Sequence, residues 1–177
     1  MAAEPPVRIV GCGRWSMGDD QAGLAVADRL RHRAIPNVAV VGSEAPGTEL
    51  PAGLGEAVEL LVLIDAAVAD ERHPPGTSER IRDRGQLKLA ATGPHRNTHS
   101  LNVDTGLRLA AALGTLPKDT WIYAIFGSNF DRCLELSPEV EAGIEPLTRR
   151  IEHEVRQWLA THASGWRTTD SHPGCCG

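Results

Sequence analysis

The chain has 177 residues, 41% of them hydrophobic and 23% charged, which is typical of one soluble globular domain. Its net charge is −5, with acidic and basic residues interleaved, so we do not expect a nucleic-acid-binding surface. The sequence has neither an apolar run long enough to span a membrane nor a signal-peptide pattern after Met1. We therefore expect a cytoplasmic protein.

The first half of the chain alternates strand-like and helix-like segments. Short apolar runs predict three strands, at residues 7–11, 37–41 and 60–65. Residue spacing predicts two helices between them, at 20–32 and 48–57, the second with Thr48 as its N-cap. The strand at 60–65 is apolar until its last residue, as expected of a strand that is covered on both faces.

The second half begins with a long polar stretch, 69–85, which is typical of a functional or mobile loop. The same patterns then predict strands at 86–91 and 120–126, and helices at 102–113 and from Ser137 to about residue 159. Gly143 and Pro146 predict a break or kink near the start of the last helix. The polar tail, 161–177, is expected to be disordered.

This order of elements predicts the fold class. Strands that alternate with helices form a mostly parallel sheet with helices on both faces. We therefore expect a single three-layer α/β/α domain over residues 7–160, with a twisted sheet of about five strands. An antiparallel edge strand between residues 69 and 91 would be compatible with this fold.

Two carboxylates and one histidine follow predicted strands. Asp20 follows the first strand, Asp65 closes the third, and His99 follows the strand at 86–91. The carboxyl ends of parallel strands share one edge of the sheet, where open α/β folds place their sites. Because two oxygen donors and one imidazole suit a divalent transition metal, the sequence predicts a metal site there.

Some neighbours of these residues have simpler roles. Asp19 and Asp20 diverge by about 100° on a helix, so we expect one to cap it and the other to face the cleft. His95 lies four residues before His99, but Gly93-Pro94 predicts a loop there, so one of the two histidines is incidental.

Other motifs do not indicate a different chemistry. The turn Gly11-Cys12-Gly13 lacks the third glycine of a dinucleotide-binding motif, since Ser16 stands there, and no P-loop follows. The chain has no G-x-S-x-G, no H-E-x-x-H and no cysteine–histidine protease signature. The cysteines are expected to be reduced, with Cys12 and Cys133 as packing residues. For His172, Cys175 and Cys176 in the tail, disorder is favoured over a metal site.

Four segments in order carry a more specific signal. They are Gly18-Asp19-Asp20-Gln21-Ala22-Gly23 after the glycine turn, Leu61-Val62-Leu63-Ile64-Asp65-Ala66, Asn97-Thr98-His99-Ser100-Leu101, and Leu136-Ser137-Pro138-Glu139-Val140. Together, over roughly residues 7–160, the chain resembles the hydrogenase maturation endopeptidases. These proteases trim the C-terminus of the large subunit of nickel–iron hydrogenases.

The resemblance implies a function and a set of site residues. It implies an endopeptidase that processes a large-subunit precursor, with Asp20, Asp65 and His99 as the metal-binding and catalytic residues. The relevant metal would be nickel supplied by the substrate, so the isolated enzyme would hold no metal tightly.

Three positions depart from the family pattern. Arg14 stands where asparagine is usual, Gln21 where glycine is usual, and Ser128 within a segment that is usually Gly-Ile/Val-Glu/Gln. We expect these positions to line the cleft and to alter the substrate or its docking.

Two other functions remain open at this point. One is a hydrolase with its own zinc, in which Asp20 or Asp65 is the general base. The other is a non-catalytic binder of an immature hydrogenase subunit, which the three departures would favour.

Overall fold

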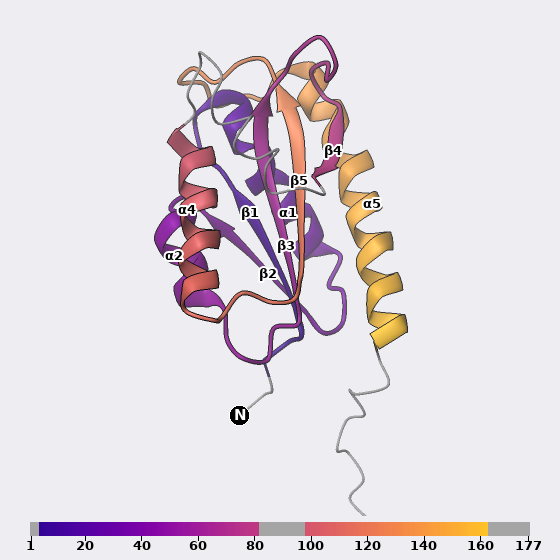
Figure 1. Ribbon diagram of the computed structural model, residues 1–177. Coiled ribbons are helices and arrows are strands. Elements are labelled where there is room, and N and C mark those ends of the chain that lie inside the picture. Colours follow the sequence, from indigo (N-terminus) through magenta and orange to yellow (C-terminus); the bar gives the residue numbers. More distant parts are fainter. Residues whose placement is uncertain (1–3, 82–97, 163–177) are drawn as a thin grey trace, which may run out of the picture.

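The structure is a computed structural model that describes residues 4–81 and 98–162, without the side chains of 98–102 (Figure 1). Its middle layer is a sheet with the strand order β2-β1-β3-β5-β4. The strands are β1 (Val7–Cys12), β2 (Val38–Ser43), β3 (Leu60–Val68), β4 (Ser78–Ile81) and β5 (Asp119–Gly127). All neighbours are parallel except β4, which runs antiparallel to β5 at one edge. The predicted α/β fold with a mostly parallel sheet is confirmed.

Helices cover both faces of this sheet (Figure 1). On one face lie α1 (Ala22–His32) and α5 (Pro138–His162), and on the other α2 (Pro46–Gly53) and α4 (Thr98–Ala112). Because side chains alternate along a strand, β3 contributes to both cores, with Val62 against the first pair of helices and Leu63 against the second. None of the described helices has the length and apolar character that crossing a membrane requires.

The direction of winding reverses between β1 and β3. The chain passes from β1 through α1 to β2 at one edge, and then through α2 to β3 on the other side of β1. In open α/β sheets, ligands bind in the crevice at such a switch point, outside the carboxyl ends of the strands. The pairing of β1 with β3 ends at Gly11 and Ile64, so Asp65 is the first residue of β3 beyond it.

Two glycines allow α1 to lie directly on the sheet. A Cβ atom added at Gly23 would lie 2.3 Å from the carbonyl oxygen of Cys12 and 2.5 Å from that of Ile64. A Cβ atom at Gly11 would lie 2.2 Å from the carbonyl oxygen of Gly23. This contact fixes the start of α1, and the 3-10 turn η1 (Gly18–Gln21) before it, close to the crevice.

Some boundaries in the first half differ from the sequence-based prediction. The helix predicted at 20–32 begins with η1 and becomes α-helical only at Ala22. Thr48 is not an N-cap: Ala45 occupies that position, and the Thr48 hydroxyl donates back to the Ala45 carbonyl oxygen at 3.2 Å. The proline at residue 46 explains the earlier start, because its fixed φ and missing N–H suit the first turn of a helix. The strand predicted to end at Asp65 continues to Val68, paired with β5.

The second half also differs in detail. β4 lies inside the polar stretch 69–85 and is an antiparallel edge strand, whereas the strand predicted at 86–91 lies outside the described residues. The predicted loop at His99 is wrong, because α4 begins at Thr98, downstream of the helix-breaking Gly93-Pro94. Of the break or kink expected in the last helix, the break is wrong, since α5 continues through Gly143 and Pro146 to residue 162, and the kink stays a prediction. Burial of one apolar face of α5 compensates for the hydrogen bond that Pro146 cannot donate.

We predict that Gly23→Ala destabilises the protein by about 2 kcal/mol or more, because the new methyl group would overlap backbone atoms of two strands. Helix propensity alone would have the opposite sign, with alanine favoured by about 1 kcal/mol. Urea unfolding measures the change. Gly42→Ala is the matched control, since its added Cβ would meet only a Leu24 side-chain atom, at 3.1 Å. Equal stability of the two variants would contradict the packing argument.

Candidate active site

Asp19 joins the turn after β1 to the loop after β5 through hydrogen bonds. Its fully buried carboxylate accepts four hydrogen bonds from that loop: from the N–H groups of Ser128 (2.8 Å), Asn129 (2.9 Å) and Ser137 (2.7 Å) and from the Ser137 hydroxyl (3.0 Å). Ser137 immediately precedes α5, so Asp19 serves the start of α5 and not its own helix. Of the adjacent aspartates Asp19 and Asp20, Asp19 is therefore the structural one.

Asp20 forms an ion pair with Arg14. The Nε atom of Arg14 donates to Oδ2 of Asp20 at 3.1 Å. The Asp20 side chain is 1% exposed and that of Arg14 is 38% exposed, so the pair connects the interior with the surface. Sequence reasoning placed Arg14 in the cleft but missed this contact, because the path of the turn between them carries no residue pattern.

Asp65 is the second buried carboxylate at this edge. Its Oδ1 accepts a hydrogen bond from the N–H of Ala66 at 3.0 Å. Burial, together with the negative charge of Asp20, raises the pKa of Asp65 from its ordinary value of 3.8 to about 7. The fold therefore brings Asp20 and Asp65 close enough to repel each other. A carboxyl group with a pKa near 7 can exchange a proton at physiological pH.

Cys12 borders this acidic pair without joining its chemistry. The thiol is buried in the core between the sheet and the α2–α4 layer. Its burial raises the pKa of the Cys12 thiol well above the ordinary value, and the charges of Asp65 and Glu49 act in the same direction. Cys12 therefore stays a neutral thiol that packs in the core, as the sequence predicted.

His99 lies in the first turn of α4. α4 directly precedes β5 in the chain and runs antiparallel to β5 and to its parallel neighbour β3 (Figure 1). The first turn of α4 therefore lies at the carboxyl edge of these two strands. The structure does not describe the His99 side chain. Among the described residues alone, no three His, Cys, Asp or Glu side chains form a group that could hold a metal ion. The site of Asp20, Asp65 and His99 stays a prediction, and His95 and the tail cluster of His172, Cys175 and Cys176 lie outside the described residues.

The three departures from the family pattern have different surroundings. The buried Gln21 side chain donates from Nε2 to the Leu134 carbonyl oxygen at 3.0 Å, and Ser128 donates its N–H to Asp19. Both therefore contribute to fastening the loop after β5. Of the three, Arg14 is the residue that contacts a candidate metal ligand.

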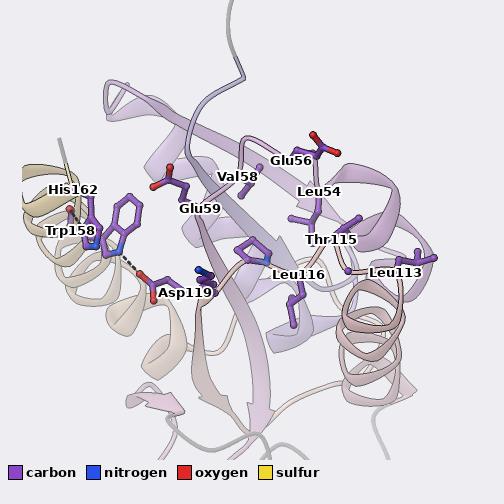
Figure 2. A pocket seen from close by; sticks show the side chains of 14 residues that line it. Leu54, Glu56, Val58, Glu59, Leu113, Thr115, Leu116, Asp119, Trp158 and His162 are labelled. Atoms are coloured by element: carbon purple, nitrogen blue, oxygen red, sulfur yellow. Dashed lines mark hydrogen bonds between the residues drawn. The ribbon is translucent and has the colours of Figure 1, made fainter. Parts of the chain in front are cut away.

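A cavity of about 800 Å³ lies at the opposite edge of the sheet (Figure 2). It is lined by residues before β3, at the start of β5 and at the end of α5, among them Glu59, Asp119 and Trp158. The Trp158 indole donates to the Asp119 carboxylate at 2.7 Å and joins α5 to β5 (Figure 2). Neither Asp20 nor Asp65 lines this cavity.

The architecture is that of the hydrogenase maturation endopeptidases. Over 153 residues the chain is 24% identical to hydrogenase 2 maturation protease of Escherichia coli K12, across 85% of this chain and 91% of that protein. The solved structure of the hydrogenase maturating endopeptidase HybD from Escherichia coli matches with a TM-score of 0.73 and 23% identity, over 86% of this chain and 93% of that one. A NiFe hydrogenase maturation protease, HybD from Thermococcus kodakarensis, matches with a TM-score of 0.66 and 26% identity, over 84% and 97% of the two chains. No protein-family model matches the chain. The resemblance to this class of protease is confirmed.

We predict that Asp19→Asn destabilises the protein by about 3 kcal/mol, because an amide N–H₂ would face N–H donors in a buried site. The free energy of unfolding in urea measures this loss. The control is Asp131→Asn, an exposed aspartate in the same loop, which should change stability by less than about 0.5 kcal/mol. Similar small losses in both variants would show that the Asp19 contacts do not hold the loop.

We predict that Asp65→Asn stabilises the protein increasingly as the pH rises. Between its ordinary pKa of 3.8 and its folded pKa of about 7, Asp65 keeps a proton in the folded state that the unfolded chain has lost. The wild-type protein therefore loses about 1.4 kcal/mol of stability from this group per pH unit in that window, and the loss persists above it. Asparagine does not ionise, so this pH-dependent loss of stability is absent from the variant.

Urea unfolding of both proteins at about pH 5, 6, 7 and 8 tests this pH dependence. The stability difference between Asp65→Asn and wild type should grow up to about pH 7 and then level off. A difference that is constant with pH would mean that Asp65 titrates normally.

Proposed function

We propose that this protein is an endopeptidase that removes a C-terminal extension from the nickel-loaded large-subunit precursor of a nickel–iron hydrogenase. The observation that carries the proposal is the pair of buried carboxylates, Asp20 and Asp65, at the switch point of a fold that maturation endopeptidases share. The sequence similarity to a hydrogenase maturation protease over 85% of the chain supports the same activity.

In this proposal Asp20, Asp65 and His99 bind the nickel ion of the substrate. Carboxylate oxygens and an imidazole nitrogen suit a divalent transition metal. The raised pKa of Asp65 supports this role, since burial and a neighbouring negative charge disfavour its ionised form unless a cation approaches. The nickel arrives with the precursor and leaves with the processed subunit, so it is part of the substrate.

Docking through the nickel ion would hold the scissile peptide bond next to the acidic pair. Positioning of this kind lowers the entropic part of the barrier to hydrolysis. Water attacks the carbonyl carbon, the C–N bond breaks, and the leaving nitrogen takes a proton. A metal ion can polarise the carbonyl or activate the water.

The two alternatives make different predictions for the purified protein. A hydrolase with its own metal would contain zinc at about one equivalent. A non-catalytic binder would hold the precursor without shortening it. The similarity to named maturation proteases favours neither alternative.

We predict that the wild-type protein shortens its cognate nickel-loaded precursor and that His99→Ala abolishes this processing while leaving the fold intact. The matched control is His153→Ala, which removes an exposed histidine of α5 and should process at the wild-type rate. Intact-protein mass spectrometry of the large subunit follows the reaction, and circular dichroism checks the fold. Wild-type processing by His99→Ala would remove this residue from the site, and binding without processing by the wild type would support the non-catalytic alternative.

A further inference from the structure

Arg14 reaches a buried candidate ligand from the surface. Its Nε atom lies 3.1 Å from Oδ2 of Asp20, which is 1% exposed, while the Arg14 side chain itself is 38% exposed. Arg14 belongs to the turn between β1 and η1, and the next residue, Trp15, is 51% exposed. The guanidinium thus occupies a place next to Asp20 where a cation is attracted.

We propose that the Arg14 guanidinium stays paired with Asp20 until nickel held by a substrate displaces it. Arg14 thereby makes the site select substrate-held nickel over free metal ions. This inference rests on the proposed function, in which Asp20 binds the nickel of the precursor. It adds a residue that controls access and is itself no metal ligand.

The competition follows from the charge of arginine. A guanidinium stays protonated under all physiological conditions and has no lone pair to offer a metal ion. A metal ion and the guanidinium therefore repel each other when both approach the Asp20 carboxylate. Because Arg14 is partly exposed, its guanidinium can move into water when a metal ion binds. The free energy of binding any metal ion at Asp20 is then reduced by the free energy of the ion pair between Arg14 and Asp20.

This loss affects free and substrate-held metal differently. For a free ion, only its bonds to the ligands of the site can offset the loss of the ion pair. Nickel held by a precursor is accompanied by protein–protein contacts outside the site, and binding energy from such remote contacts can offset a local cost. Arg14 therefore lowers the affinity for free ions to a level at which they do not occupy the site, while the precursor still docks.

The test measures the dissociation constant of the purified full-length protein for Ni²⁺ at neutral pH, by competition with a chromophoric chelator. Arg14→Gln removes the charge and keeps a polar side chain, and we expect it to bind Ni²⁺ about tenfold more tightly than the wild type. Arg14→Lys keeps the charge and should bind as weakly as the wild type. Arg14→Ala is a second neutral variant, which carries the test if Arg14→Gln does not fold by circular dichroism.

Two controls separate this effect from a general change in charge. Arg132→Gln removes an exposed arginine from the loop after β5 and should leave the Ni²⁺ affinity unchanged. In an Asp20→Asn background, Arg14→Gln should no longer raise the affinity. Equal or weaker Ni²⁺ binding in the neutral Arg14 variants, no detectable binding in any variant, or the same gain in Arg132→Gln would each overturn the proposal. Precursor cleavage by the wild type is measured separately, so its failure would remove the proposed function without changing the affinity result.

Discussion

The carboxylate of Asp19 joins the two segments that border the candidate site. Four hydrogen bonds connect it to the loop between β5 and α5, and Gly127 at the end of β5 lets that loop approach, since a Cβ atom there would lie 2.5 Å from the Cβ of Asp19. Successive side chains of a helical turn point in different directions. Because the Asp19 side chain points to the loop, the Asp20 side chain points elsewhere. Asp20 forms an ion pair with Arg14, and its charge raises the pKa of Asp65.

The site itself reduces the stability of the fold. Asp20 and Asp65 are both buried, and their mutual repulsion adds to the desolvation that raises the pKa of Asp65. Arg14 supplies a positive charge from the solvent side. A hydrophobic or amide residue at position 65 would avoid the cost of a buried charge, and this cost makes Asp65 a candidate for binding a cation or moving a proton.

Local patterns predicted the fold and the place of Asp65 at the end of a buried strand, because the information lay in short segments. The apolar run before Asp65 indicated a buried strand, and β3 is one. Which of Asp19 and Asp20 is structural could not be decided from the sequence, since the partners of Asp19 lie more than 100 residues away in the chain. The ion pair of Arg14 was missed for a related reason, because it depends on the path of a turn. His99 was expected in a loop, and its helical position depends on where α4 begins relative to Pro94.

The measurement that tests this account most directly compares nickel-loaded and nickel-free precursor as substrates of the wild-type protein. The mass of the large subunit is followed over time at equal concentrations of both forms. If the substrate's nickel docks on Asp20, Asp65 and His99, only the loaded precursor loses its C-terminal extension. Cleavage of both forms at the same rate would contradict docking through the metal.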